Sequence, residues 1–353
     1  MEIVAWIRAH RTALVVLVAI VAILWTLQQL GFNVPIWSGC TADLDKCSSI
    51  IALGLFQGMI VSLIALGYTL VYGILQLINF ANGDVFMLGS VMTLLGVQIV
   101  GLQSDSPAIS VILTFAILLP VTMLLMAGLN ASIERIAYRP LRRAPTLATL
   151  ISAIGMSFIL QNVGQKIIGP SPVSLPNLLP TSNIIGPGGL LEIGTLEIKV
   201  SHLFVTVVTM PLLFGLMWFV RSTRQGKAMR ATAQDREAAG LMGIDVNRTI
   251  TLTFLLAGAL AGGAGIVVAL YNGSAWWFYG TPYGLLAFTA AVLGGIGNLL
   301  GAAIGGIILG ILISLNAFYF EQRWQEVFVF GILVLILVFR PTGLLAEKQS
   351  ERA

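Results

Sequence analysis

The chain has 353 residues, of which 57% are hydrophobic and only 10% are charged, and its formal net charge is +4. This composition lies outside the range of soluble domains, and no polar stretch is long enough to hold a separate soluble domain. No basic stripe is interleaved with aromatic residues, so we expect no nucleic-acid partner. We therefore predict an all-α, polytopic transmembrane helical bundle that forms a single domain over residues 1–353, in contact with membrane lipid.

Apolar runs recur along the whole chain, each long enough to cross about 30 Å of hydrocarbon. The residues between the second and third runs, 71–84, are expected to form an irregular connection. The eighth run is short and is followed by a glycine-rich segment, so eight spans plus a re-entrant pair is an alternative to ten spans. The predicted spans are about ten: 12–32, 49–70, 85–103, 107–130, 146–168, 200–220, 249–271, 284–297, 299–316 and 326–340.

The first span could be a cleaved signal peptide instead of a retained helix. Its apolar run from Ala13 to Leu27 is longer than a usual signal core, and no A-x-A cleavage site follows it. We therefore predict a retained helix. Cys40 and Cys47 lie in the loop that follows this span, and in an oxidising compartment they are candidates for a disulfide. Two free thiols are the alternative.

The distribution of basic residues orients the spans. Of the 19 Lys and Arg residues, 15 fall in segments on one side of the predicted membrane, including the loops 131–145 and 221–248. Because cytoplasmic loops carry an excess of Lys and Arg, both termini are predicted to be cytoplasmic.

Polar residues interrupt the apolar segment Leu66–Gly89, and an anchor helix would not carry them because unsatisfied polar groups in hydrocarbon are costly. Asparagine side chains supply donors and acceptors, and glycines let a ligand approach the backbone. We predict that a broken helix here lines a substrate pathway. The candidate pathway residues are Gly73, Asn79, Asn82, Gly83 and Asp84, with Asn298 as a counterpart in the second half of the chain. For the pairs Gly258/Gly262 and Gly301/Gly305 we predict close helix packing instead.

Asp84 allows a different reading, that of an ion-coupled secondary carrier, because such a carrier needs a titratable group at membrane depth. Asp84 also stands at the predicted start of a helix, where a carboxylate caps the helix and stabilises its dipole. We favour the capping role.

Enzymatic chemistry has little support in this chain. His10 and His202 are its only histidines, neither has a partner at metal-ligand spacing, and no nucleotide-binding P-loop motif is present. We predict no catalytic residue, no metal site and no cofactor held by this chain.

The loop 221–248 combines alanines with charges and predicts a short amphipathic helix near residues 227–242. Ala231, Gln234, Ala238 and Leu241 would share one face of that helix. A solvated basic loop is the alternative. A helix of small residues followed by Gly243 is better suited to a groove on a cytoplasmic partner.

The same loop carries a more specific resemblance. Glu237, Ala238, Ala239 and Gly243 match the E-A-A-x-x-x-G pattern of ABC importer permeases, although the later I-x-L-P part of that pattern is missing. The runs G-Y-T-L-V-Y-G and I-N-F-A-N-G-D-x-x-x-L-G over residues 67–89, and the glycine-rich block 291–306, resemble the LivH-type permeases of the branched-chain amino-acid ABC importer family. The matches cover most of residues 50–340. Many members have His where this chain has Asn82.

The resemblance implies a permease subunit of the bacterial inner membrane without catalytic activity. It implies a second, LivM-like permease, two cytoplasmic ATPases that bind ATP and Mg, and a periplasmic substrate-binding protein. Residues 221–248 would be the coupling loop, with Asp235 and Glu237–Gly243 at its centre. The substrates would be branched-chain or hydrophobic amino acids, with urea or short amides as the alternative.

Two outward features could form a surface for the binding protein. Trp276, Trp277 and Tyr279 follow the seventh predicted span and are otherwise expected to be interfacial aromatics. The loop 170–199 contains prolines that should keep it extended instead of helical.

Overall fold

The computed structural model describes residues 44–76, 79–142, 144–180, 183–185, 198–320, 322–340 and 343–345. The predicted first span, 12–32, lies outside the described residues, and so does Cys40. The disulfide between Cys40 and Cys47 therefore stays a prediction.

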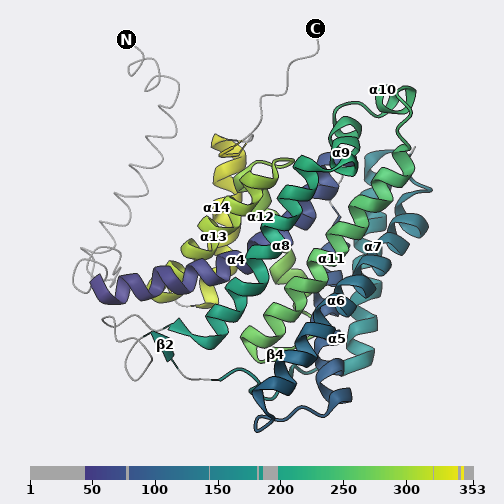
Figure 1. Cartoon of the computed structure of the whole chain (residues 1–353). Coiled ribbons are helices and arrows are strands. Elements are labelled where there is room, and N and C mark those ends of the chain that lie inside the picture. The colour runs from purple at the N-terminus through teal and green to yellow at the C-terminus, as the bar shows by residue number, and fades with distance from the viewer. Residues whose placement is uncertain are drawn as a thin grey trace, which may run out of the picture.

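The described residues form a bundle of long apolar helices (Figure 1). Among the described residues, eight helical segments are long and apolar enough to cross a membrane, and α12 is a shorter apolar helix. The predicted all-α, polytopic fold is confirmed. The helices are α4 (Leu44–Leu75), α5 (Ala81–Val100), α6 (Ala108–Ile133) with a π-helical turn η1 (Glu134–Tyr138), α7 (Thr146–Ile168), α8 (Val200–Ser222), α9 (Arg224–Gln234), α10 (Arg236–Leu241), α11 (Val246–Asn272), α12 (Gly280–Gly294), α13 (Leu299–Phe320), a 3₁₀ turn η2 (Gln322–Trp324) and α14 (Gln325–Phe339).

Two short antiparallel ribbons, which we had not predicted, join the loops. Strand β1 (Val173–Ser174) pairs with β4 (Ser274–Ala275), and β2 (Asn183–Ile185) pairs with β3 (Ile198–Lys199). The described part of the loop 170–199 contains no helix, as its prolines predicted. The first ribbon fixes the segment after α7 to the segment after α11.

Helices α4, α5, α11 and α13 form the interior of the bundle, and small residues let their backbones approach. A Cβ atom at Gly58 of α4 would lie 2.7 Å from the Cα of Ile307, and one at Gly306 of α13 would lie 2.6 Å from the Cα of Ser62. At Gly265 of α11, a Cβ atom would lie 2.6 Å from the backbone of α5. The close packing that we predicted for Gly258/Gly262 and Gly301/Gly305 is also confirmed, because added Cβ atoms at all four would lie within about 3 Å of a neighbouring backbone.

Helices α6, α7, α8 and α14 lie at the periphery. Only 22% of the most apolar window of α6 and of α7 is buried, 28% of that of α8 and 6% of that of α14. These apolar surfaces are suited to lipid or to another membrane subunit.

The structure favours a crossing over a re-entrant pair for α13. This helix has 22 residues and runs antiparallel to α4, with Ile311 beside Gly54 and Gly297, just before α13, beside Gly73. Helix α12 has only 15 residues and begins beside Gly83. The non-helical segment that precedes α12 therefore supplies part of the distance across the bundle.

Basic residues gather at one end of the bundle, which we call the basic end. It carries α9, α10 and the connection between η1 and α7, and these lie at the top of Figure 1. The placement of this end, and of both termini, in the cytoplasm remains a prediction.

Candidate functional site

The predicted interruption lies between α4 and α5, but it is shorter than the sequence suggested. Helix α4 continues to Leu75, Gln76 adopts a left-handed backbone conformation with φ 55°, and α5 begins at Ala81. We call the described residues between these helices, Gln76, Asn79 and Phe80, the α4–α5 break. The prediction of an irregular segment over 71–84 was too wide, because Gly73 packs beside Gly297 and leaves the helical hydrogen bonds of α4 intact.

Asn79 and Asn82 lie at this break, and both are buried. The Oδ1 atom of Asn79 accepts a hydrogen bond from the hydroxyl of Tyr138 at 2.6 Å. Both amide atoms of Asn82 and the Nδ2 atom of Asn79 have no hydrogen-bond partner among the described residues. Since a buried amide without a partner is costly, these groups are suited to a ligand or a water molecule. Their role in a substrate pathway remains a prediction.

Asp84 lies in the first turn of α5, as predicted, but its side chain does not cap the helix. Its oxygens accept hydrogen bonds from Ser157 at 2.5 Å and from Gln161 at 3.1 Å, both on α7. The Nε2 atom of Gln161 also donates to the hydroxyl of Thr281 on α12 at 3.1 Å. The predicted position of the carboxylate at the start of the helix, where it interacts favourably with the dipole, is confirmed, but its hydrogen bonds join three helices instead of capping α5. Sequence spacing does not show this, because these partners lie far from Asp84 along the chain.

The two pathway glycines have packing contacts in the structure. A Cβ atom at Gly83 would lie 2.5 Å from the carbonyl oxygen of Gly280 and 3.2 Å from the hydroxyl of Tyr68. At Gly73 it would lie 3.6 Å from the Cα of Gly297. Gly83 therefore brings the starts of α5 and α12 together, and Gly73 borders the segment before α13.

Asn298 directly follows Gly297, which packs beside the pathway residue Gly73. It lies at the basic end, where its Oδ1 accepts from the backbone N–H groups of Leu300 and Gly301 and its Nδ2 donates to the carbonyl of Leu345. The side chain caps α13 and holds the segment after α14. These contacts stabilise the start of α13, and the role of Asn298 in a substrate pathway remains a prediction.

The coupling-loop residues form two short helices instead of one. Asp235 separates α9 from α10 in an extended conformation, and its carboxylate accepts from the backbone N–H groups of Glu237 and Ala238 at 2.9 and 3.1 Å. The predicted single helix over 227–242 was wrong because this aspartate caps a new helix where the old one ends.

The tip of this segment is exposed and apolar. Glu237 and Ala238 are exposed, Ala239 is buried, and Gly243 ends the segment with φ 82°. Leu241 and Met242 are 89% and 83% exposed. Two neighbouring apolar side chains in this position indicate a contact with a partner, and sequence reasoning had placed only Leu241 on the predicted face.

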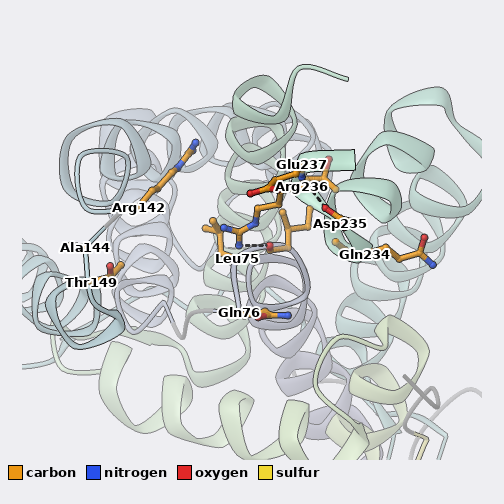
Figure 2. Close-up of a pocket in the computed structure, with 12 residues that line it drawn as sticks. Leu75, Gln76, Arg142, Ala144, Thr149, Gln234, Asp235, Arg236 and Glu237 are labelled. Atoms are coloured by element: carbon orange, nitrogen blue, oxygen red, sulfur yellow. Dashed lines mark hydrogen bonds between the residues drawn. The ribbon is translucent and has the colours of Figure 1, made fainter. Parts of the chain in front are cut away.

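A cavity of about 570 Å³ lies at the basic end between the α4–α5 break, the start of α7 and the α9–α10 segment (Figure 2). Arg142 borders it, pairs with the buried Glu134 and donates to Asn247 at 2.5 Å. Arg236 also borders it, and burial together with the Arg142 charge lowers the pKa of Arg236 below its usual value. The lining is thus polar and carries charges of both signs.

The remaining candidates, His202 and the outward tryptophans, make contacts with neighbouring parts of the chain. The ring of His202 stacks on Phe56 at 4.6 Å, and its Nδ1 accepts from the backbone N–H of Lys199. Within the described ranges, no group of three or more His, Cys, Asp or Glu residues could hold a metal ion. The indole N–H groups of Trp276 and Trp277 both donate to the carbonyl of Pro170, at 3.3 and 2.8 Å.

The fold and the break define the class as a multi-pass helical membrane protein whose interior is interrupted by buried polar groups. Residues 50–337 match the family model of the branched-chain amino acid transport system permease component, and the chain belongs to this family.

Similar proteins with known names are permeases of the same kind of transport system. The chain is 39% identical over 300 residues, 85% of its length and 95% of the relative's, to BraD of Pseudomonas aeruginosa, a high-affinity branched-chain amino acid transport system permease protein. It is 38% identical over 302 residues, with the same coverage of both chains, to the protein LivH of Escherichia coli K12, which has the same description. No solved structure matches the chain.

Proposed function

We propose that this chain is the permease subunit of an ATP-driven ABC importer of branched-chain or hydrophobic amino acids in the bacterial inner membrane. The family match over residues 50–337 carries the proposal. The chain would form half of a pore with a second, LivM-like permease. Two cytoplasmic ATPases would bind ATP and Mg and carry out the hydrolysis, and a periplasmic binding protein would deliver the substrate.

The α9–α10 segment supports the assignment of the coupling loop. It projects from the basic end, and its exposed apolar pair, Leu241 and Met242, stands beside the exposed Glu237. A surface of this kind buries apolar area on a cytosolic protein and supplies a charge at the rim of the contact. We place the ATPase contact here. We place the substrate pathway at Asn79 and Asn82, because the Nδ2 atom of Asn79 and both amide atoms of Asn82 are buried without a partner among the described residues.

The test is uptake of radiolabelled leucine and urea into proteoliposomes that contain this chain with or without its partner permease, ATPases and binding protein. We expect leucine uptake only with the complete set and ATP. Uptake of urea instead would assign the amide branch. Uptake by this chain alone along an ion gradient, abolished by Asp84→Asn, would establish an ion-coupled carrier and overturn the proposal.

The coupling loop has its own test. Gly243 has a left-handed backbone that any side chain would strain, and open space around it, so Gly243→Trp should distort the tip of the loop while it adds no clash with the bundle. We expect the variant to reach the membrane in normal amounts but to lose leucine uptake, and Glu237→Lys to act in the same direction. Normal uptake by Gly243→Trp would exclude the coupling role.

A further inference from the structure

Arg236 connects the α9–α10 segment directly to the α4–α5 break. Its Nη2 atom donates a hydrogen bond to the carbonyl oxygen of Ile74 at 2.7 Å, and these residues are 162 positions apart in the chain. Figure 2 shows the Arg236 side chain reaching down from the segment of Asp235 and Glu237 to the end of α4.

The acceptor is a carbonyl group that the helix itself leaves free. The last four carbonyls of a helix have no intrahelical N–H partner, and a cation there also interacts favourably with the helix dipole. Ile74 is the penultimate residue of α4, and the chain leaves the helix through the left-handed Gln76. The guanidinium therefore holds the point at which α4 gives way to the break.

The other side of the break is held from a different element. Tyr138, in η1 at the end of α6, donates to the side chain of Asn79 at 2.6 Å. The backbone N–H of Asn82 in turn donates to the carbonyl of Asn79 at 3.1 Å. A movement of α10 relative to α6 would consequently shift the two sides of the break relative to each other. The buried amide of Asn82, which has no partner among the described residues, lies next to it.

The space for such a movement is present. The cavity of about 570 Å³ separates Arg236 and Glu237 from Arg142, Ala144 and Thr149. Closely packed interiors resist displacement, whereas a segment beside a cavity can shift without forcing its neighbours apart.

We propose that Arg236 is a positioning residue that transmits movement of the α9–α10 segment to the α4–α5 break, and so to Asn79 and Asn82. This inference rests on the proposed function, in which the ATPases move that segment. Arg236 does not itself contact substrate in this assignment; it acts through the carbonyl of Ile74.

The competing role for Arg236 is a positive charge that helps the ATPase to bind. Arg224 on α9 provides the matched control, because it is exposed in the same segment and its side chain makes no hydrogen bond within the described part of the chain. Arg236→Lys keeps the charge and a donor, and Arg236→Ala removes both.

The first experiment measures leucine taken up per ATP hydrolysed by the complete importer in proteoliposomes. We expect Arg236→Ala to lower this ratio several-fold while ATP hydrolysis continues, Arg236→Lys to recover most of it, and Arg224→Ala to match the unmodified importer. An unchanged ratio in Arg236→Ala would overturn the inference, and so would an equal fall in Arg224→Ala.

The second experiment follows the movement itself with spin labels at exposed positions. One pair joins Gln76 to Leu147 and reports the break, and the other joins Gln225 to Leu147 and reports α9. On trapping the ATPases with ATP and vanadate, we expect both distances to change in the unmodified importer and only the α9 distance to change in Arg236→Ala. A change of the break distance in Arg236→Ala would contradict the transmitting role.

The two proposals fail in different ways. Absence of ATP-dependent uptake by the unmodified complete set would overturn the proposed function. Normal uptake with an Arg236→Ala variant that stays fully coupled would overturn only the role of Arg236.

Discussion

The interior and the peripheral helices are similarly apolar, yet most of their glycines have opposite surroundings; Gly164 on α7, which packs beside Met87, is an exception. At Gly58, Gly265 and Gly306, on interior helices, an added Cβ atom would meet the backbone of another helix at 2.7 Å or less. At Gly128, Gly155, Gly215 and Gly331, on α6, α7, α8 and α14, it would meet nothing within 4 Å.

This difference shows what holds the bundle together. Lipid is as apolar as a leucine side chain, so hydrophobicity alone does not pull helices together in a membrane. Close approach of backbones does so among α4, α5, α11, α12 and α13. Buried hydrogen bonds add to it and tie α6 and α7 to this interior. The peripheral helices keep apolar surfaces available for lipid or for a second permease.

The largest effect is expected from filling an interior glycine. Gly306→Leu would drive a side chain into the backbone at Ser62 and should destabilise the protein by on the order of 3 kcal/mol or more. The measurement is the amount of folded protein and its unfolding temperature after extraction in detergent. Gly155→Leu on α7 is the control and should change neither. Equal losses in both variants would remove the distinction between interior and periphery.

A smaller loss is expected at Asp84, which ties the interior helix α5 to the peripheral helix α7. Asp84→Ala leaves Ser157 and Gln161 without their acceptor and should cost about 2 kcal/mol of stability. Asp84→Asn keeps the size and one acceptor and should cost less. The unfolding temperature in detergent provides the comparison, and an unchanged value for Asp84→Ala would mean that the three-helix contact does not stabilise the bundle.

Substitutions at Asn82 and Asn130 allow effects on stability to be distinguished from effects on transport within the interior. Both are fully buried, but Asn130 donates to the carbonyl of Phe254 at 2.9 Å, whereas neither amide atom of Asn82 has a partner among the described residues. We expect Asn130→Leu to lower stability by about 1 kcal/mol. Asn82→Leu should leave stability equal or higher, because it removes an unpaired amide, yet lower leucine uptake several-fold. A large loss of stability in Asn82→Leu would argue against a pathway role.

The smallest effect concerns the contact between the loops after α7 and α11. Trp277→Phe keeps an aromatic ring but loses the indole N–H donated to Pro170 and should cost about 1 kcal/mol. Faster proteolysis of the segment after α7 is the expected sign. Trp218→Phe on the exposed face of α8 is the matched control and should leave the rate unchanged.

Much of the fold follows from hydropathy. The spans predicted at 146–168 and 200–220 agree with α7 and α8 to within two residues, because lipid-exposed helices end where the apolar run ends. The bounds of helix α4 were predicted less well, because the helix extends beyond both ends of the predicted span 49–70. Neighbouring helices protect polar or glycine-containing turns that hydropathy alone assigns to loops.

The site was predicted less completely. Asn79 lies before α5 and Asp84 in its first turn, close to where the interrupted pattern had placed them, but their partners Tyr138, Ser157 and Gln161 come from distant parts of the chain. Arg236 appeared in the sequence as one base among many in a loop. Its carbonyl acceptor at Ile74 depends on the tertiary fold, and a single sequence carries no signal for it.

The short helix α12 has a consequence for the order in which the chain enters the membrane. Trp277 packs beside Gly164, and Thr281 is bonded to Gln161, so the non-helical segment before α12 lies alongside the last turns of α7. Backbone without helical hydrogen bonds is tolerated at such a depth only where protein surrounds it. We therefore expect the segment before α12 to enter the membrane only after α5 and α7 are in place to surround it. Its insertion would then be a late step in the assembly of the bundle.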